Sequence, residues 1–140
     1  MLQIQSGAIG RFAFGMVVLL VMAACNRMQP IYNVVDRPIP SQTQNLSLDE
    51  IGRNIVIAGT RRHWRFDRLA PGQLRASYSE KTYEAVVLIS FTQQAYSIHL
   101  DQTVNLKENG DEIHRTYNRW VMNLERDIDD QLSRAGLGVK

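Results

Sequence analysis

The spacing of the hydrophobic residues changes twice along this chain, from a helical repeat to alternation and back to a helical repeat. The first helical segment begins at Ser47-Leu48-Asp49-Glu50, a capping box that satisfies backbone N–H groups of the first turn. Apolar residues then recur at helical spacing to about Thr60. The last segment carries one apolar stripe, and Gly136 is a natural stop for its helix. The members of this stripe are Ile113, Tyr117, Trp120, Val121, Leu124, Ile128 and Leu132.

Between the two helical segments, four stretches alternate apolar and polar residues as β-strands do. These stretches begin at about Trp64, Leu74, Thr82 and Tyr96. The links between them are short and carry turn signals, of which Pro71-Gly72 is the clearest. The pattern predicts an α+β fold over residues 47–137. We expect a two-layer sandwich in which a four-stranded antiparallel meander carries two helices on one face, in the order α-β-β-β-β-α.

The N-terminus has the pattern of a secretory signal peptide. Arg11 is followed by the apolar run Phe12–Met22 and then by the small residues Ala23 and Ala24. As a helix, this run would span only about 16 Å, whereas the hydrocarbon core of a bilayer is about 30 Å thick. The pattern therefore favours a signal peptide over residues 1–24. The alternative is an uncleaved signal anchor that ends at Cys25.

The segment Met22-Ala23-Ala24-Cys25 resembles the lipobox of bacterial lipoproteins, although that family usually has Leu where this chain has Met22. The resemblance implies cleavage before Cys25 and covalent attachment of acyl chains, such as palmitate, to that cysteine. Two or three acyl chains anchor a protein stably, whereas one binds reversibly. Asn26 stands where inner-membrane lipoproteins of enterobacteria have Asp, which implies the periplasmic face of the outer membrane. We expect no cofactor other than the lipid on Cys25.

Residues 25–46 predict a tether between the lipid and the domain. Pro30, Pro38 and Pro40 lie among polar residues, and proline favours extended chain without backbone donors. The apolar residues between positions 31 and 35 complicate this interpretation. They could pair as an edge strand or pack on the domain, so we expect a tether whose middle is partly docked.

Charge and cysteine content exclude some classes of function. The formal net charge is +2, from 16 basic and 14 acidic residues, which gives no case for nucleic acid binding. The chain has one cysteine, which cannot form an internal disulfide. If Cys25 is lipidated, no free thiol is left for catalysis or for a metal ion.

Several motifs resemble a family of small bacterial lipoproteins without an established activity. They lie between Ser47 and Leu132, and the most specific is the string Ile113-His114-Arg115-Thr116-Tyr117-Asn118-Arg119-Trp120-Val121. The weaker ones are Trp64, Pro71-Gly72, Tyr96-Ser97-Ile98 and Asn105-Leu106. The resemblance implies a fold and a location in the envelope, and it implies no catalytic residue.

A first candidate site is the sheet face turned away from the helices. If Ala85, Val87, Ile89 and Phe91 face the helices, alternation sends Val86 and Leu88 to the opposite face. The neighbouring strands bring polar residues beside them, among which we expect Arg75, Ser77, Ser97, His99 and Asp101. Apolar residues rimmed by polar groups are typical of a modest protein interface. Alternatively, Val86 and Leu88 are isolated surface residues, or residues 31–35 cover them.

A second candidate is the arginine-rich segment 61–68. Arg61, Arg62 and Arg65 could bind phosphates or carboxylates of lipopolysaccharide or peptidoglycan. Alternatively, Trp64 and Phe66 belong to the core and the arginines are solvated or paired with acids. Alternation along a strand favours the second interpretation, because it separates Arg65 from the aromatic residues.

His114 and Asn118 lie one helical turn apart beside the apolar stripe. Partly buried polar groups need partners. We expect these two residues to bond to the end of the sheet or to the loop of residues 105–111, and so to fix how the helix docks. A polar binding site at this position is the alternative.

The sequence shows no recognisable catalytic or metal-binding motif. His63, His99 and His114 lack ligand spacing, and there is neither a Gly-x-Ser-x-Gly elbow nor a phosphate-binding glycine loop. The pattern favours a non-enzymatic, membrane-anchored interaction module with an envelope protein as partner. The alternatives are polymer binding through the arginines, and a small envelope enzyme that uses His99 with Asp101 or His114.

Overall fold

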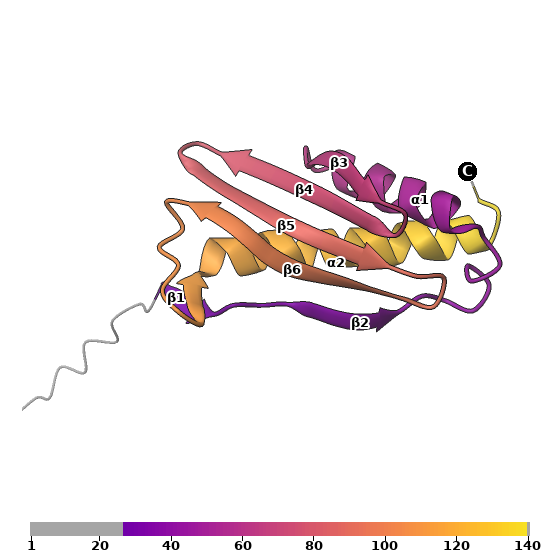
Figure 1. Ribbon diagram of the computed structural model, residues 1–140, viewed down its shortest axis with the longest axis horizontal. Coiled ribbons are helices and arrows are strands. Elements are labelled where there is room, and N and C mark those ends of the chain that lie inside the picture. The colour runs from indigo at the N-terminus through magenta and orange to yellow at the C-terminus, as the bar shows by residue number, and fades with distance from the viewer. Residues whose placement is uncertain (1–26, 140) are drawn as a thin grey trace, which may run out of the picture.

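The structure is a computed structural model that describes residues 27–139. The predicted signal peptide and Cys25 lie outside these residues. An antiparallel sheet of five strands, in the order β2-β6-β5-β4-β3, forms the body of the domain (Figure 1). These strands are β2 (Val34–Pro38), β3 (Arg65–Ala70), β4 (Gln73–Glu80), β5 (Tyr83–Phe91) and β6 (Ala95–Val104). The predicted α+β class is confirmed, and the sheet has five strands where the sequence predicted four.

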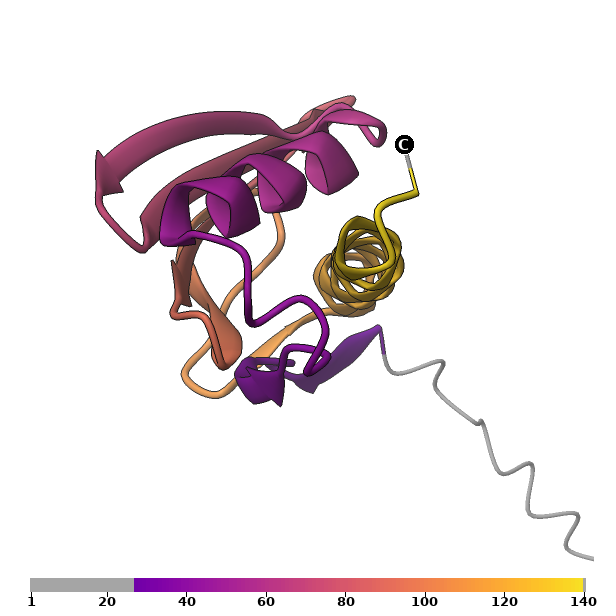
Figure 2. The same cartoon turned by 90° about the vertical axis from the view of Figure 1, so that its right-hand side faces the viewer.

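Both predicted helices are present. Helix α1 (Leu48–Thr60) starts with the predicted capping box, in which Ser47 Oγ accepts from the Glu50 N–H and the Glu50 carboxylate accepts from the Ser47 N–H. Helix α2 (Arg115–Gly136) ends at the predicted glycine. Figure 2 shows both helices on the same side of the curved sheet. None of the helices formed by residues 27–139 combines the length and the apolar character that crossing a membrane requires.

The core lies between the sheet and the two helices. Strand β5 alternates as predicted, with Ala85, Val87, Ile89 and Phe91 buried on the helical side. Three aromatic rings join the layers at one point, because Tyr78 packs 5.4 Å from Trp64 and 4.7 Å from Trp120 between ring centroids. Helix α2 buries Val121, Leu124, Ile128 and Leu132 in the same core.

The segment predicted as a tether contains two β-strands. Strand β1 (Met28–Pro30) pairs with β7 (Glu112–His114), and β2 adds a fifth strand to the sheet beside β6. Pro30 and Pro38 are compatible with this pairing because each ends a strand that has a neighbour on one side only. Between β2 and α1 the chain contacts the last turns of α2. Thr43 is buried there, and its hydroxyl donates to the Leu132 carbonyl at 2.7 Å. Residues 28–46 are therefore part of the domain, as the edge-strand alternative required.

We expect Ile39→Ala to lower the free energy of unfolding by about 2 to 5 kcal/mol, because the Ile39 side chain is only 2% exposed and its removal leaves a cavity. Val35→Ala is the matched control in the same segment. Val35 is 64% exposed, so its truncation should change stability by less than about 0.5 kcal/mol. Chemical denaturation measures both changes. Two equally neutral variants would mean that the segment is a free tether.

Candidate functional site

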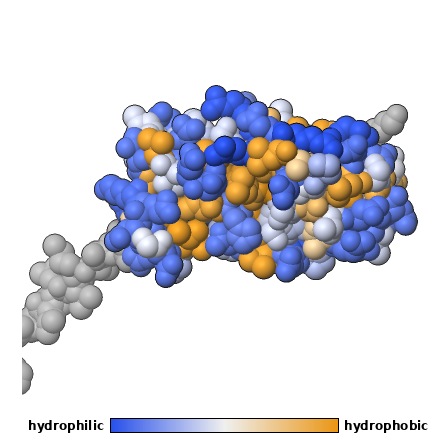
Figure 3. All heavy atoms as spheres, in the orientation of Figure 1, coloured by the Kyte–Doolittle hydropathy of each residue, from blue (hydrophilic) through white to orange (hydrophobic). Residues whose placement is uncertain are grey.

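The outer face of the sheet brings together most of the residues predicted for an interaction surface. Leu88 lies opposite Arg75 on one neighbouring strand and opposite His99 on the other. Val86, two residues earlier on β5, is partly exposed on the same face. Figure 3 looks onto this face and shows apolar side chains gathered among polar ones.

A shallow hollow of about 230 Å³ lies over this row, and we call it the outer hollow. Leu69, Gln73, Leu88, Ser90 and His99 are among the residues that line it. Leu69 is 52% exposed and Leu88 is 38% exposed, so the hollow presents two branched apolar side chains to solvent. Sequence analysis missed Leu69 because a register shift between Arg68 and Ala70 breaks the alternation of β3 at this point.

An ion pair borders the outer hollow. The Arg75 guanidinium lies 2.6 Å from the Asp101 carboxylate, and both side chains are partly exposed. Such a pair contributes little to stability, at most about 1 kcal/mol. It places a cation beside Leu88, the register partner of Arg75, and an anion next to that cation. A partner with an apolar contact and complementary charges would fit this arrangement.

The structure separates the three arginines of the proposed anion site. Arg61 and Arg62 follow helix α1 and line a hollow of about 290 Å³ beside Trp64 and Trp120. Arg65 is exposed on β3 and pairs in register with Ser77 of the outer face. Arg62 forms an ion pair with Asp127, which raises the pKa of the guanidinium. The C-terminal end of a helix carries partial negative charge, so the position beside α1 favours cations over anions.

His114 and Asn118 both take part in joining segments of the chain. The Nδ1 atom of His114 accepts from the Thr116 N–H at 3.3 Å, which caps the start of α2. The side chain of Asn118 accepts from the Tyr32 N–H at 3.0 Å and donates to the Pro30 carbonyl at 2.9 Å. The partners of Asn118 thus lie in the N-terminal segment, whereas the sequence analysis expected the sheet end or the loop of residues 105–111.

We expect Asn118→Ala to cost about 1 to 3 kcal/mol of stability, because it leaves a backbone donor and a backbone acceptor without their partner. Asn123→Ala is the matched control on the same helix. Asn123 accepts only an exposed bond from Arg126 among the interactions found for it, so its loss should cost less than about 0.5 kcal/mol. Thermal unfolding followed by circular dichroism compares the two. Equal stability of both variants would contradict the stabilising role of the two bonds between Asn118 and the N-terminal segment.

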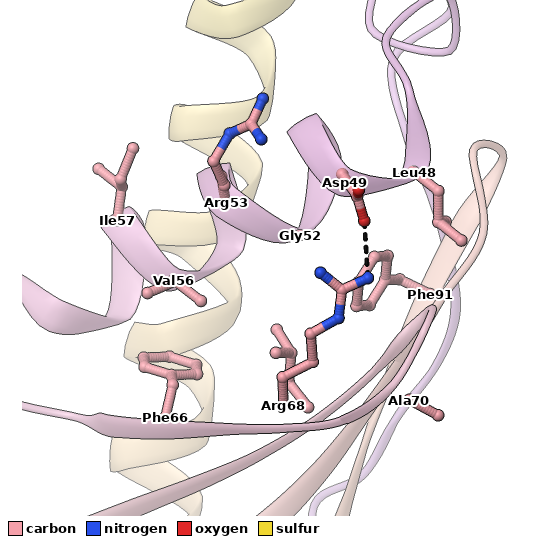
Figure 4. Close-up of a pocket in the computed structure, with 11 residues that line it drawn as sticks. Leu48, Asp49, Gly52, Arg53, Val56, Ile57, Phe66, Arg68, Ala70 and Phe91 are labelled. Carbon is pink, nitrogen blue, oxygen red and sulfur yellow. Dashed lines mark hydrogen bonds and ion pairs between the residues drawn. The ribbon is translucent and has the colours of Figure 1, made fainter.

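A further hollow, which lies between α1 and β3, was not predicted (Figure 4). Its volume is about 380 Å³, and apolar side chains form most of its walls. These include Leu48, Val56, Ile57, Phe66, Leu74 and Phe91. Arg68 and Asp49 pair at 2.7 Å across it, as the dashed line in the figure shows. The arrangement can accept an apolar group. Gly52 in α1 was the one sequence feature that pointed to this hollow, because a glycine lets another element approach the helix closely. A Cβ at this position would lie 2.9 Å from the Phe91 ring.

Within residues 27–139, no group of three or more His, Cys, Asp or Glu side chains is placed to hold a metal ion. His63, His99 and His114 lie on different elements of the fold. The carboxylate of Asp101, suggested as a partner of His99, pairs with Arg75.

Comparison with known proteins finds no matching family model, no matching curated protein and no matching solved structure. The resemblance to small bacterial lipoproteins therefore stays a prediction from the sequence motifs.

Proposed function

We propose that this protein is a lipoprotein, anchored through Cys25 to the periplasmic face of the outer membrane, whose domain is a non-enzymatic interaction module. The leader pattern before Cys25 supports the anchor. The outer hollow supports the module, and it is the observation that carries the proposal. An envelope protein is the partner that this surface and this location favour.

The chemistry of the outer hollow suits a protein partner. Leu69 and Leu88 supply exposed apolar contact area at its centre. His99 and the Arg75–Asp101 pair add polar groups around them, which give a partner its orientation and register. Interfaces of this kind place an apolar centre inside a polar rim.

The hollow also lies at a distance from the anchored end of the chain. Tyr83, at the start of β5, lies beside Met28, and Leu88 follows five residues further along the same strand. At about 3.3 Å per residue, Leu88 is roughly 17 Å from that end. Figure 1 shows β1 at one end of the long axis and α1 towards the other. A module anchored through Cys25 would therefore present this surface to the periplasm.

The anchor is tested by Cys25→Ser expressed from the full precursor. We expect the variant to lose incorporation of radiolabelled palmitate and to accumulate with residues 1–24 still attached, because the peptidase that cuts lipoproteins requires the modified cysteine. Gel electrophoresis of membrane fractions reports both changes. A variant that is cleaved and membrane-bound like the wild type would exclude lipidation at Cys25.

The interaction surface is tested by a photo-crosslinking residue in place of Leu69 in living cells, followed by mass spectrometry. We expect a specific protein adduct, and Leu88→Asp combined with Arg75→Glu should abolish it by placing unfavourable charge in the hollow. Met122→Asp is the matched control, since Met122 is exposed on α2, which lies on the other side of the sheet. The control should leave the adduct unchanged. Absence of any adduct, or equal loss in both variants, would refute the surface.

A further inference from the structure

The end of the domain that carries β1 contains a pocket that the sequence analysis did not predict. Its volume is about 360 Å³. We call it the anchored-end pocket, and its lining includes Arg27, Met28, Tyr83, Asn105, Lys107 and His114. Two of these side chains are cations, one is an imidazole, and none is an acid.

The distance from this pocket to Cys25 is short. Met28 begins β1, and the Arg115 N–H donates to the Arg27 carbonyl at 2.7 Å, so residue 27 is already part of the fold. Two residues of fully extended chain span at most about 7 Å. An acyl group on Cys25 would therefore hold the anchored-end pocket at the level of the lipid headgroups.

The pocket is built by contacts between three segments. The Asn105 side chain donates to the Thr82 carbonyl at 2.7 Å, which ties the turn before β5 to the end of β6. The His114 ring stacks on Tyr83 with 6.1 Å between centroids. Because Nδ1 of His114 accepts from the backbone, its Nε2 is the nitrogen that carries a proton and can donate.

Positive charge dominates the electrostatics at His114. Burial and the nearby charges of Arg27, Arg115 and Lys107 lower the pKa of the imidazole below its usual value. Acidic side chains also occur near this end of the domain, but they do not line the pocket. They are Glu80, which is the register partner of Tyr83, and Glu84, Glu108, Asp111 and Glu112. Glu108 is held by the hydroxyl of Thr103 at 3.2 Å.

We propose that the anchored-end pocket binds the phosphate of an anionic lipid headgroup in the membrane layer that holds the anchor. The guanidinium of Arg27 and the ammonium of Lys107 match the charge of a phosphate, and His114 adds a neutral donor. The location, though not the chemistry, rests on the proposed lipidation of Cys25. Headgroup binding at this end would hold the outer hollow away from the membrane surface.

The test uses the whole mature chain, residues 25–140, with Cys25→Ser, so that binding does not depend on a lipid anchor. The probes are vesicles of phosphatidylcholine with and without phosphatidylglycerol, and sedimentation at low salt measures binding. We expect binding only to the vesicles that contain phosphatidylglycerol. Arg27→Ala combined with Lys107→Ala should weaken it roughly 30-fold, since each cation near an anionic surface contributes about a fivefold factor.

The matched control is Arg126→Ala combined with Arg134→Ala, which removes the same charge from exposed positions further along α2. We expect the control to retain binding, and Lys107→Arg to retain it as well. Equal weakening by both double variants would show a diffuse charge effect and overturn the pocket, as would a lack of sedimentation with phosphatidylglycerol. Lipidation is measured separately on the precursor, so failure of either proposal is recognised on its own.

Discussion

The docking of the N-terminal segment against α2 is the interaction on which the rest of this structure depends. Asn118 binds the backbone of residues 30 and 32 from the start of the helix. About two turns further along, Glu125 accepts from the Tyr32 hydroxyl at 2.6 Å. About one turn beyond it, Asp129 accepts from the Tyr96 hydroxyl at 2.7 Å. Polar groups spaced along one side of α2 thus fix the N-terminal strands and the edge of the sheet to the same helix.

These contacts decide what the proposed anchor can do. A flexible tether would let the domain rotate freely above a membrane, whereas a fold that already includes residue 27 cannot move far from a lipid on Cys25. The two ends of the domain then acquire different roles. The basic pocket around Arg27 and Lys107 would meet the headgroups, and the apolar surface around Leu88 would meet a partner.

Local patterns predicted much of the fold. The capping box at Ser47 located the start of α1, and strict alternation in β5 assigned Leu88 to the outer face. The pairing of β1 with β7 could not be predicted, because partners more than 80 residues apart, such as Gln29 and Ile113, leave no local signal. Prolines in the same segment favoured an extended tether, yet an edge strand accepts proline without losing a bond to its single neighbour.

The candidate sites also divide into those that local patterns predicted and those that depend on distant contacts. The alternation that separated Arg65 from the aromatic residues was a sound reason to doubt a compact arginine site, and the register places Arg65 opposite Ser77. Leu69 and the hollow between α1 and β3 were missed because each depends on how distant segments approach one another. Tertiary packing fixes both the register shift in β3 and the space beside Gly52. The spacing of residues in the sequence contains no information about such packing.

Hydrogen exchange of the backbone amides in the mature chain shows whether the N-terminal segment is docked on the domain. The N–H groups of Ile31, Tyr32 and Ile39 donate to Asp111, Asn118 and Gln94, respectively. We expect these amides to exchange far more slowly than in an unstructured peptide, and we expect Asn118→Ala to accelerate the exchange at Tyr32. Exchange of all three at the rate of a free peptide would show that residues 28–46 form a tether, and it would remove the basis for an oriented, membrane-apposed domain.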